Sequence, residues 1–160
     1  MKRIWISNAV IVNEGKKFQG SIVIEGETIS EVLTGSQRPS EECEEEIDAQ
    51  GAYLIPGVID DHVHFRDPGL THKADMSSET MAAAAGGVTS FMDMPNCNPQ
   101  TTTLEALENK FEDAAKKCMV NYSFYFGATN NNASLLAQLD RKKVLSLIHI
   151  SEPTRRTPIS

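Results

Sequence analysis

The sequence has little of what marks several large classes of protein. Only three cysteines occur in 160 residues, and none of them forms a CxxC pair, which argues against a disulfide framework or a thiolate zinc cluster. No apolar run is long enough to cross a bilayer, and the N-terminal segment lacks the small-residue cleavage site of a signal peptide. We therefore expect a protein of the reducing cytoplasm.

Positive charge is scarce as well. Fifteen Lys and Arg residues stand against 22 Asp and Glu residues, which gives a formal net charge of −7 at pH 7. This balance argues against a nucleic acid or an anionic membrane as the main partner. The hydrophobic fraction of 40% is that of an ordinary globular chain, and the length suits one domain of usual size.

The first third of the chain predicts a β unit built from hairpins. Residues rich in β-branched side chains occupy 3–13, 21–25 and 28–33, and short glycine-containing turns separate them. The polar and acidic residues 35–47 follow. We expect a solvated loop there, because a run of like charges is usually exposed.

From residue 52 the pattern changes to alternating strands and helices. Residues 52–65, "AYLIPGVIDDHVHF", are apolar for most of their length and predict a strand buried on both faces of a parallel sheet. The following segments are then predicted: helix 74–86, strand 88–94, helix 104–118, strand 120–128 and helix 132–140. Gly86-Gly87 is expected to end the first helix, and Thr103 to cap the start of the second. This order predicts parallel strands with crossover helices, as in a (β/α)8 barrel or a doubly wound sheet. Three βα units are too few to close a barrel.

Two histidines stand one residue apart at the end of the first of these strands, in "DDHVHFRDPG", residues 60–69. Because strand side chains alternate between faces, Asp60, His62, His64 and Arg66 are expected to share one face. Two imidazoles at such spacing on a rigid strand can hold one metal ion, and strand ends form the catalytic rim of a βα barrel. A pair of surface histidines is the alternative, and the position at the strand end favours the metal.

Two side chains in the neighbouring loops are candidate substrate ligands. The guanidinium of Arg66 has a planar fork of donors that suits a carboxylate, although a surface ion pair with Asp67 or Asp75 is an alternative. Asn96 lies in the proline-bracketed loop 93–103. Its amide could bind a carboxylate or a ring amide of a substrate, or it could serve the turn itself.

The end of the chain breaks the pattern. Within residues 145–160, the stretch "LSLIHISEPTR" resembles the translated end of a transposase-type sequencing-library adapter, and such scars are excluded from fold reasoning. We expect this tail to be non-native and to lack stable packing, so His149 is no ligand candidate. The natural segment then runs from residue 1 to about residue 144.

The motifs resemble those of a known family. "HVHFRDPG" at 62–69 and "AAAAGGVTSFMDMPNCNPQTTT" at 82–103 closely resemble dihydroorotases of the amidohydrolase superfamily, and the resemblance runs from residue 3 to about 144. It implies an α/β fold in which residues 55–144 are the first three or so βα units of a metal-dependent hydrolase (β/α)8 TIM barrel. Residues 1–54 would be the N-terminal strands of a small composite β-sandwich.

The resemblance also implies a chemistry. Dihydroorotases catalyse the zinc-dependent, reversible hydrolysis of the cyclic amide of dihydroorotate to N-carbamoyl-aspartate in pyrimidine biosynthesis. His62 and His64 would bind the more buried zinc of a binuclear site, and Arg66 and Asn96 would bind the substrate carboxylate. The bridging carboxylate, two further His ligands and the catalytic Asp would come from later strands. We therefore assign no catalytic residue here and expect this segment alone to be inactive.

Alternatives stay open at this point. Allantoinases and dihydropyrimidinases share the HxH pair and the "AAAGGVT" stretch but usually differ at "HFRDPG" and at the "MPN" loop. A non-catalytic dihydroorotase-like partner of a carbamoyltransferase is the other alternative, which the presence of both histidines disfavours. The expected partner is a small-molecule substrate, with no nucleic acid and no membrane, and the full-length protein is compatible with a homo-oligomer.

The interpretation of the tail can be checked on the source DNA. Genomic DNA sequenced after adapter trimming is expected to encode a different continuation beyond about residue 144, because adapter-derived codons belong to the library and not to the gene. An independent genomic read that encodes "LSLIHISEPTR" at this place would show that the tail is native.

Overall fold

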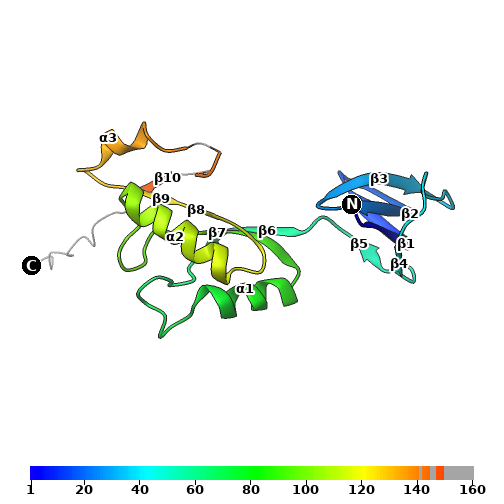
Figure 1. The fold of residues 1–160 in the computed structure, drawn as a ribbon, viewed down its shortest axis with the longest axis horizontal. Helices are drawn as coiled ribbons and strands as arrows, with labels where there is room; N and C mark the ends of the chain where they lie inside the picture. The colour runs from blue at the N-terminus through cyan, green and yellow to red at the C-terminus, as the bar shows by residue number, and fades with distance from the viewer. Residues whose placement is uncertain (141, 145–146, 150–160) are drawn as a thin grey trace, which may run out of the picture. The chain divides into compact units, whose positions relative to one another are not determined.

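The protein is described by a computed structural model that covers residues 1–140, 142–144 and 147–149 (Figure 1). The chain divides into two compact units, the first ending at Pro56 and the second beginning at Gly57. None of the helices in the described residues has the length and apolar character needed to cross a membrane.

The first unit is a five-stranded sheet. Its strands are β1 (Arg3–Asn13), β2 (Lys16–Glu25), β3 (Thr28–Thr34), β4 (Glu45–Asp48) and β5 (Tyr53–Leu54). The sheet order is β3-β2-β1-β4, and β5 also pairs with β1. The two hairpins are antiparallel, whereas β4 and β5 run parallel to β1. The predicted hairpin unit is therefore confirmed.

The expectation of a solvated loop over residues 35–47 is wrong at its end, because Glu45–Asp48 form β4. Sequence polarity did not indicate this strand. Pairing with β1 uses backbone N–H and C=O groups, and charged side chains are common on edge strands, where they remain in water.

One face of this sheet is aliphatic. The cross-strand register sets Ile4 opposite Ile24, Ile6 opposite Ile22, and Ile11 opposite Phe18. Directly opposite residues share a face, so these side chains form a continuous apolar surface around the buried Ile11 and Ile22. At the outer strand of the same sheet, Ile29 and Val32 are exposed.

The second unit contains the predicted βα repeats. Its elements are β6 (Val58–Val63), α1 (Met76–Ala85), β7 (Val88–Asp93), α2 (Leu104–Lys117) and β8 (Asn121–Phe124). The strands form a parallel sheet in the order β6-β7-β8. Helix α1 contacts both β7 and α2. The predicted parallel order with crossover helices is confirmed.

Aromatic side chains fill the core of this unit. The rings of Phe65 and Phe91 lie 4.5 Å apart and those of Phe111 and Phe124 lie 4.8 Å apart, measured between centroids. Phe91, Phe124 and Phe126 are buried. Tilted and edge-on pairs at such distances are favourable beyond the area they bury, so this cluster joins the sheet to α2.

The helix ends follow the signals in the sequence. The Thr103 hydroxyl accepts a hydrogen bond from the Ala106 N–H at 3.1 Å and caps α2, as predicted. Helix α1 ends at Ala85 with Gly86 as its C-cap, and Gly87 has a φ of 83°, which glycine adopts without strain. Asp75 caps the start of α1 by accepting from the Ser78 N–H, and this bond lowers the pKa of the Asp75 carboxyl.

The prediction that the first βα strand is buried on both faces is wrong. Val58 is 46% exposed and Ile59 is 67% exposed. Within the described residues, β6 pairs with β7 alone and lies at the edge of the sheet. An apolar run indicates a strand that can be buried. Burial also requires neighbouring elements, and the described chain supplies a neighbouring strand, β7, on one side of β6 only.

The third strand and the tail also differ from expectation. The predicted strand 120–128 is divided into β8 and β9 (Phe126–Ala128), and α3 (Ala133–Leu136) is shorter than the predicted helix 132–140. The strand β10 (Leu147–His149) pairs in parallel with β9, so the expectation that the tail lacks stable packing is wrong there. An open strand edge offers N–H and C=O groups that can pair with any extended segment. Residues 145–146 and 150–160 lie outside the described residues.

The cap of α2 gives a stability prediction. Thr103→Ala removes the side-chain acceptor at the helix start and is expected to lower the free energy of unfolding by about 1 kcal/mol. Urea unfolding followed by circular dichroism measures the change. Thr103→Ser keeps the hydroxyl and is the matched control, expected to remain within a few tenths of a kcal/mol of the parent protein. Equal losses in both variants would show that the cap bond is not the cause.

Candidate metal and substrate site

The two histidines of the HxH motif lie side by side at the end of β6. Their ring centroids are 5.3 Å apart with an interplanar angle of 61°, and both side chains are exposed. Neutral imidazole nitrogen is a preferred ligand of zinc. The chemistry of His62 and His64 therefore fits two positions of a zinc shell. Within the described residues no group of three or more His, Cys, Asp or Glu side chains is placed to hold a metal, so the pair fits the ion without completing its shell.

Simple strand alternation does not hold at the end of β6. Asp60 is registered with Phe91 and Val63 with Asp93, so β6 carries one residue more than β7 over this stretch. Such a bulge twists the strand and changes the direction of its side chains. Asp60 bends back, and its carboxylate accepts the His62 N–H at 3.2 Å.

The expectation that Arg66 lies on the same strand face as the histidines is wrong. β6 ends at Val63, and Arg66 has a left-handed backbone with φ of 64°. Its carbonyl accepts the Leu70 N–H at 2.9 Å, which closes a turn after the strand. None of the ion pairs in the described part of the chain includes Arg66, so the alternative of a surface pair with Asp67 or Asp75 is not observed there.

Asn96 contacts the second histidine directly. Its Oδ1 atom lies 2.8 Å from His64 Nδ1. An amide oxygen can only accept a hydrogen bond, so Nδ1 is the donor in this arrangement, and in the neutral imidazole Nε2 then has the free lone pair. Metal-binding histidines commonly donate their second ring N–H in this way, which fixes the ring and its tautomer. The sequence motif indicated that Asn96 lies near the histidines, but it did not indicate this contact.

A buried ion pair lies behind the two loops, and sequence reasoning missed it. Asp93 ends β7 and Lys110 projects from α2; their charged atoms are 2.7 Å apart and the side chains are 1% and 0% exposed. Asp93 Oδ1 accepts the Phe65 N–H at 2.9 Å, and Lys110 Nζ donates to the Met94 carbonyl at 3.2 Å. The pair therefore contacts the residues that lead into both loops.

The two loops also touch each other. The Asn98 N–H donates to the Pro68 carbonyl at 3.0 Å, and a Cβ atom at Gly69, whose φ is 83°, would collide with the Asn98 carbonyl. Asp67 is buried and accepts from the Met76 N–H at 3.2 Å and from Lys117 Nζ at 2.9 Å. The hydrogen bond that Lys117 donates to Asp67 raises the pKa of Lys117, so this lysine keeps its charge.

The cysteines near this site do not have the character of nucleophiles. Burial raises the pKa of Cys118 to about 11, and a protonated thiol is unreactive at neutral pH. Cys97 is buried, with its Sγ atom 3.2 Å from the Pro99 carbonyl oxygen and 3.4 Å from the Thr101 hydroxyl. Both thiols therefore act as packed side chains.

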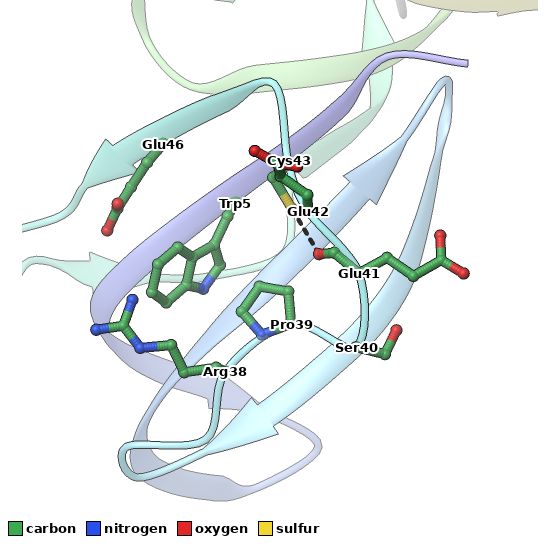
Figure 2. A pocket seen from close by; sticks show the side chains of 8 residues that line it. All are labelled: Trp5, Arg38, Pro39, Ser40, Glu41, Glu42, Cys43 and Glu46. Carbon is green, nitrogen blue, oxygen red and sulfur yellow. Dashed lines mark hydrogen bonds between the residues drawn. The ribbon is translucent and has the colours of Figure 1, made fainter.

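The first unit carries a separate pocket of about 370 Å³, shown in Figure 2. Its lining is Trp5, Arg38, Pro39, Ser40, Glu41, Glu42, Cys43 and Glu46. The guanidinium of Arg38 lies 5.2 Å from the centre of the Trp5 ring and stacks on it. No histidine lines this pocket, and its rim is acidic. It therefore does not offer the imidazole ligands of the site beside β6.

Comparisons with known proteins agree with these features. Residues 51–137 match the model of the dihydro-orotase-like family. The dihydroorotase of Lactobacillus johnsonii is 35% identical over 129 residues, which cover 81% of this chain and 29% of that protein. The allantoinase of Deinococcus radiodurans is 34% identical over 143 residues, covering 89% of this chain and 31% of that protein.

Solved structures show the same arrangement of elements. The L-hydantoinase (dihydropyrimidinase) from Arthrobacter aurescens superposes with a TM-score of 0.86 at 25% identity, over 96% of this chain and 35% of that one. A D-hydantoinase from Bacillus sp. AR9 gives a TM-score of 0.70 at 32% identity, over 84% of this chain and 29% of that one. The chain spans about three tenths of the length of the curated relatives it matches. It has their mixed α/β fold, and it belongs to the dihydro-orotase-like family of cyclic amidohydrolases.

Proposed function

We propose that this chain is the N-terminal part of a zinc-dependent dihydroorotase, which opens the ring of dihydroorotate to N-carbamoyl-aspartate and closes it in the biosynthetic direction. The observation that carries the proposal is the cluster at the ends of β6 and β7. There a pair of imidazoles, an amide in contact with one of them, and an arginine with no described ion-pair partner lie within two adjoining loops.

The proposed protein is larger than the described chain. Residues 1–54 are the N-terminal strands of a composite β-sandwich, and residues 55–144 are the first βα units of a (β/α)8 TIM barrel. The exposed apolar side chains of β3 and of β6 support this, because apolar strands are normally covered on the faces they present. Residues 145–160 are proposed to be non-native.

Each site residue has a proposed task. His62 and His64 hold zinc, which when bound would polarise the ring carbonyl and supply hydroxide at neutral pH. Asn96 keeps the proton of His64 on Nδ1 and so turns the Nε2 lone pair toward the ion. Arg66 binds the carboxylate of the substrate through its guanidinium fork. The general base and the remaining ligands are assigned to the part of the protein beyond about residue 144.

The choice of dihydroorotate over other cyclic amides depends on Arg66. Dihydroorotate carries a carboxylate on its ring, and the matching cation would be a guanidinium held close to the metal. Allantoin and simple dihydropyrimidines lack that ring carboxylate, so they would leave such a cation without an anion. Allantoinase remains the second candidate because a relative of that name is 34% identical.

The proposed location of the reaction is the cytoplasm. This compartment is reducing, so the three free cysteines would remain thiols there.

The first prediction from this proposal concerns the chain by itself. The purified chain, residues 1–160, is expected to give no measurable ring opening of dihydroorotate. Two imidazoles supply only half of a zinc shell, and no general base is assigned within residues 1–160. Ultraviolet absorbance of dihydroorotate, followed with and without added zinc, measures this. Turnover that a chelator abolishes would contradict the assignment of the remaining machinery to later residues.

The second prediction separates the metal ligand from the substrate ligand in the full-length protein. His62→Ala removes a zinc ligand, so zinc content and turnover are expected to fall together. Arg66→Ala is expected to leave zinc content unchanged and to lower kcat/KM for dihydroorotate by roughly 30- to 1,000-fold, about 2–4 kcal/mol. Most of that loss should appear in KM, because the carboxylate is bound in ground state and transition state alike.

Metal analysis beside steady-state kinetics measures both variants. Arg66→Lys is the matched control, since it keeps the charge but loses the planar fork, and its KM is expected between those of the parent and Arg66→Ala. Loss of zinc from Arg66→Ala, or an unchanged kcat/KM, would remove Arg66 from the substrate site.

A further inference from the structure

The buried pair of Asp93 and Lys110 has no task in the function proposed above. Both side chains are almost completely removed from water. At the nearby loop rim, an ion pair could form in contact with solvent and with little loss of hydration free energy. Taking two charges out of water costs free energy that their attraction only partly returns, and apolar residues of similar size often stabilise a fold as well or better. The stability of the fold therefore does not by itself explain why two charged residues occupy these buried positions.

The contacts of Asp93 lead toward the histidine loop. Its Oδ1 atom accepts the Phe65 N–H at 2.9 Å, and Phe65 directly follows His64. Its own backbone carbonyl accepts the Tyr125 N–H at 3.0 Å. The position of the peptide next to His64 is thus set by the carboxylate of a residue whose backbone is itself bonded to Tyr125, between β8 and β9.

The contacts of Lys110 lead toward the asparagine loop. Its Nζ atom donates to the Met94 carbonyl at 3.2 Å, and it lies 4.8 Å from the centre of the Phe124 ring. The Met94 N–H in turn donates to the Val63 carbonyl at 3.0 Å. The ammonium group of Lys110 therefore contacts two groups. One is the carbonyl of Met94, two residues before Asn96, and the other is the Asp93 carboxylate, which accepts the Phe65 N–H.

The contact between Asp93 and Lys110 is an attraction between charges rather than an aligned hydrogen bond. Asp93 Oδ2 makes no aligned hydrogen bond within the described residues, although it lies 2.7 Å from Lys110 Nζ. Removal of the ammonium would leave a buried carboxylate with one backbone N–H and no counter-charge. The carboxylate would then move toward water and draw the Phe65 peptide with it.

We propose that Asp93 and Lys110 are positioning residues that fix His64 and Asn96 at contact distance. The His64–Asn96 hydrogen bond of 2.8 Å joins two loops that follow different strands, and the pair holds the backbone on both sides of it. In catalysis the pair would set the direction of His64 Nε2 and the place of the Asn96 amide. This role rests on the proposed metal and substrate site.

The test uses the full-length protein that contains this segment, with three variants. Lys110→Met removes the ammonium but keeps most of the side-chain volume. Asp93→Asn/Lys110→Met makes the pair neutral while an amide oxygen remains to accept the Phe65 N–H. Lys116→Met is the matched control, because Lys116 is on the same helix and exposed, with only a 4.0 Å approach to Asp113.

Three quantities are measured on each protein: the urea midpoint, the visible d–d absorption of the cobalt-substituted site, and kcat and KM for dihydroorotate. Lys110→Met is expected to lower the urea midpoint, and the double variant to recover most of it, because no buried charge is left unpaired. The double variant should nevertheless keep an altered cobalt spectrum and a KM raised about 10- to 100-fold, the effect of a misplaced binding group. Lys116→Met should match the parent in all three.

A purely structural role gives a different pattern. Stability, cobalt spectrum and KM would then return together in the double variant, and that result would overturn the proposal. Should the double variant fail to fold, Asp93→Asn/Lys110→Gln carries the same comparison, because it also leaves no buried charge unpaired and keeps an amide oxygen as acceptor for the Phe65 N–H. A parent protein that binds cobalt without acting on dihydroorotate would overturn the proposed substrate alone, and the cobalt spectra would still decide the positioning role.

Discussion

A carboxylate held away from water at the end of β7 is the constraint on which the surrounding structure depends. The Asp93 carboxylate must be neutralised and hydrogen-bonded where it lies; two segments of the chain do so, and a third bonds the backbone of the same residue. Lys110 reaches it from α2, the Phe65 N–H reaches it from the end of β6, and the Tyr125 N–H contacts its backbone. Strand order, helix placement and loop positions are thereby tied to one side chain, and the accessible imidazoles lie directly beside it.

Much of the second unit follows from patterns in the sequence. Apolar runs separated by helices predicted the parallel strands, and Thr103 and Gly86 predicted the ends of α2 and α1, because capping is decided by neighbouring residues. The motif "DDHVHFRDPG" placed both histidines at a strand end. These features are local, so a sequence window of ten to fifteen residues contains the information they need.

The features that sequence patterns missed depend on partners far along the chain. Lys110 occupies an amphipathic helix, where a lysine normally indicates a solvated face, and only the position of Asp93 on a neighbouring strand makes it buried. Strand alternation placed Arg66 with the histidines, but the bulge after Asp60 and the turn at Arg66 end the alternation. The exposure of β6 likewise reflects which neighbours the described chain supplies, a property that an apolar run does not encode.

The contact between His64 and Asn96 limits what the site can recognise. The amide oxygen of Asn96 accepts from His64, so the group that this amide can turn toward a substrate is its NH₂, which only donates. The Arg66 guanidinium also only donates. In the proposed site, these two donors would suit a substrate that presents acceptor oxygens close to its reacting amide. A ring carboxylate meets that requirement with two oxygens and a full negative charge. A substituent that carries N–H groups would instead place hydrogen-bond donors against the donors of Asn96 and Arg66. In the proposed site, the hydrogen bond that orients the histidine would therefore also favour an anionic cyclic amide over a neutral one.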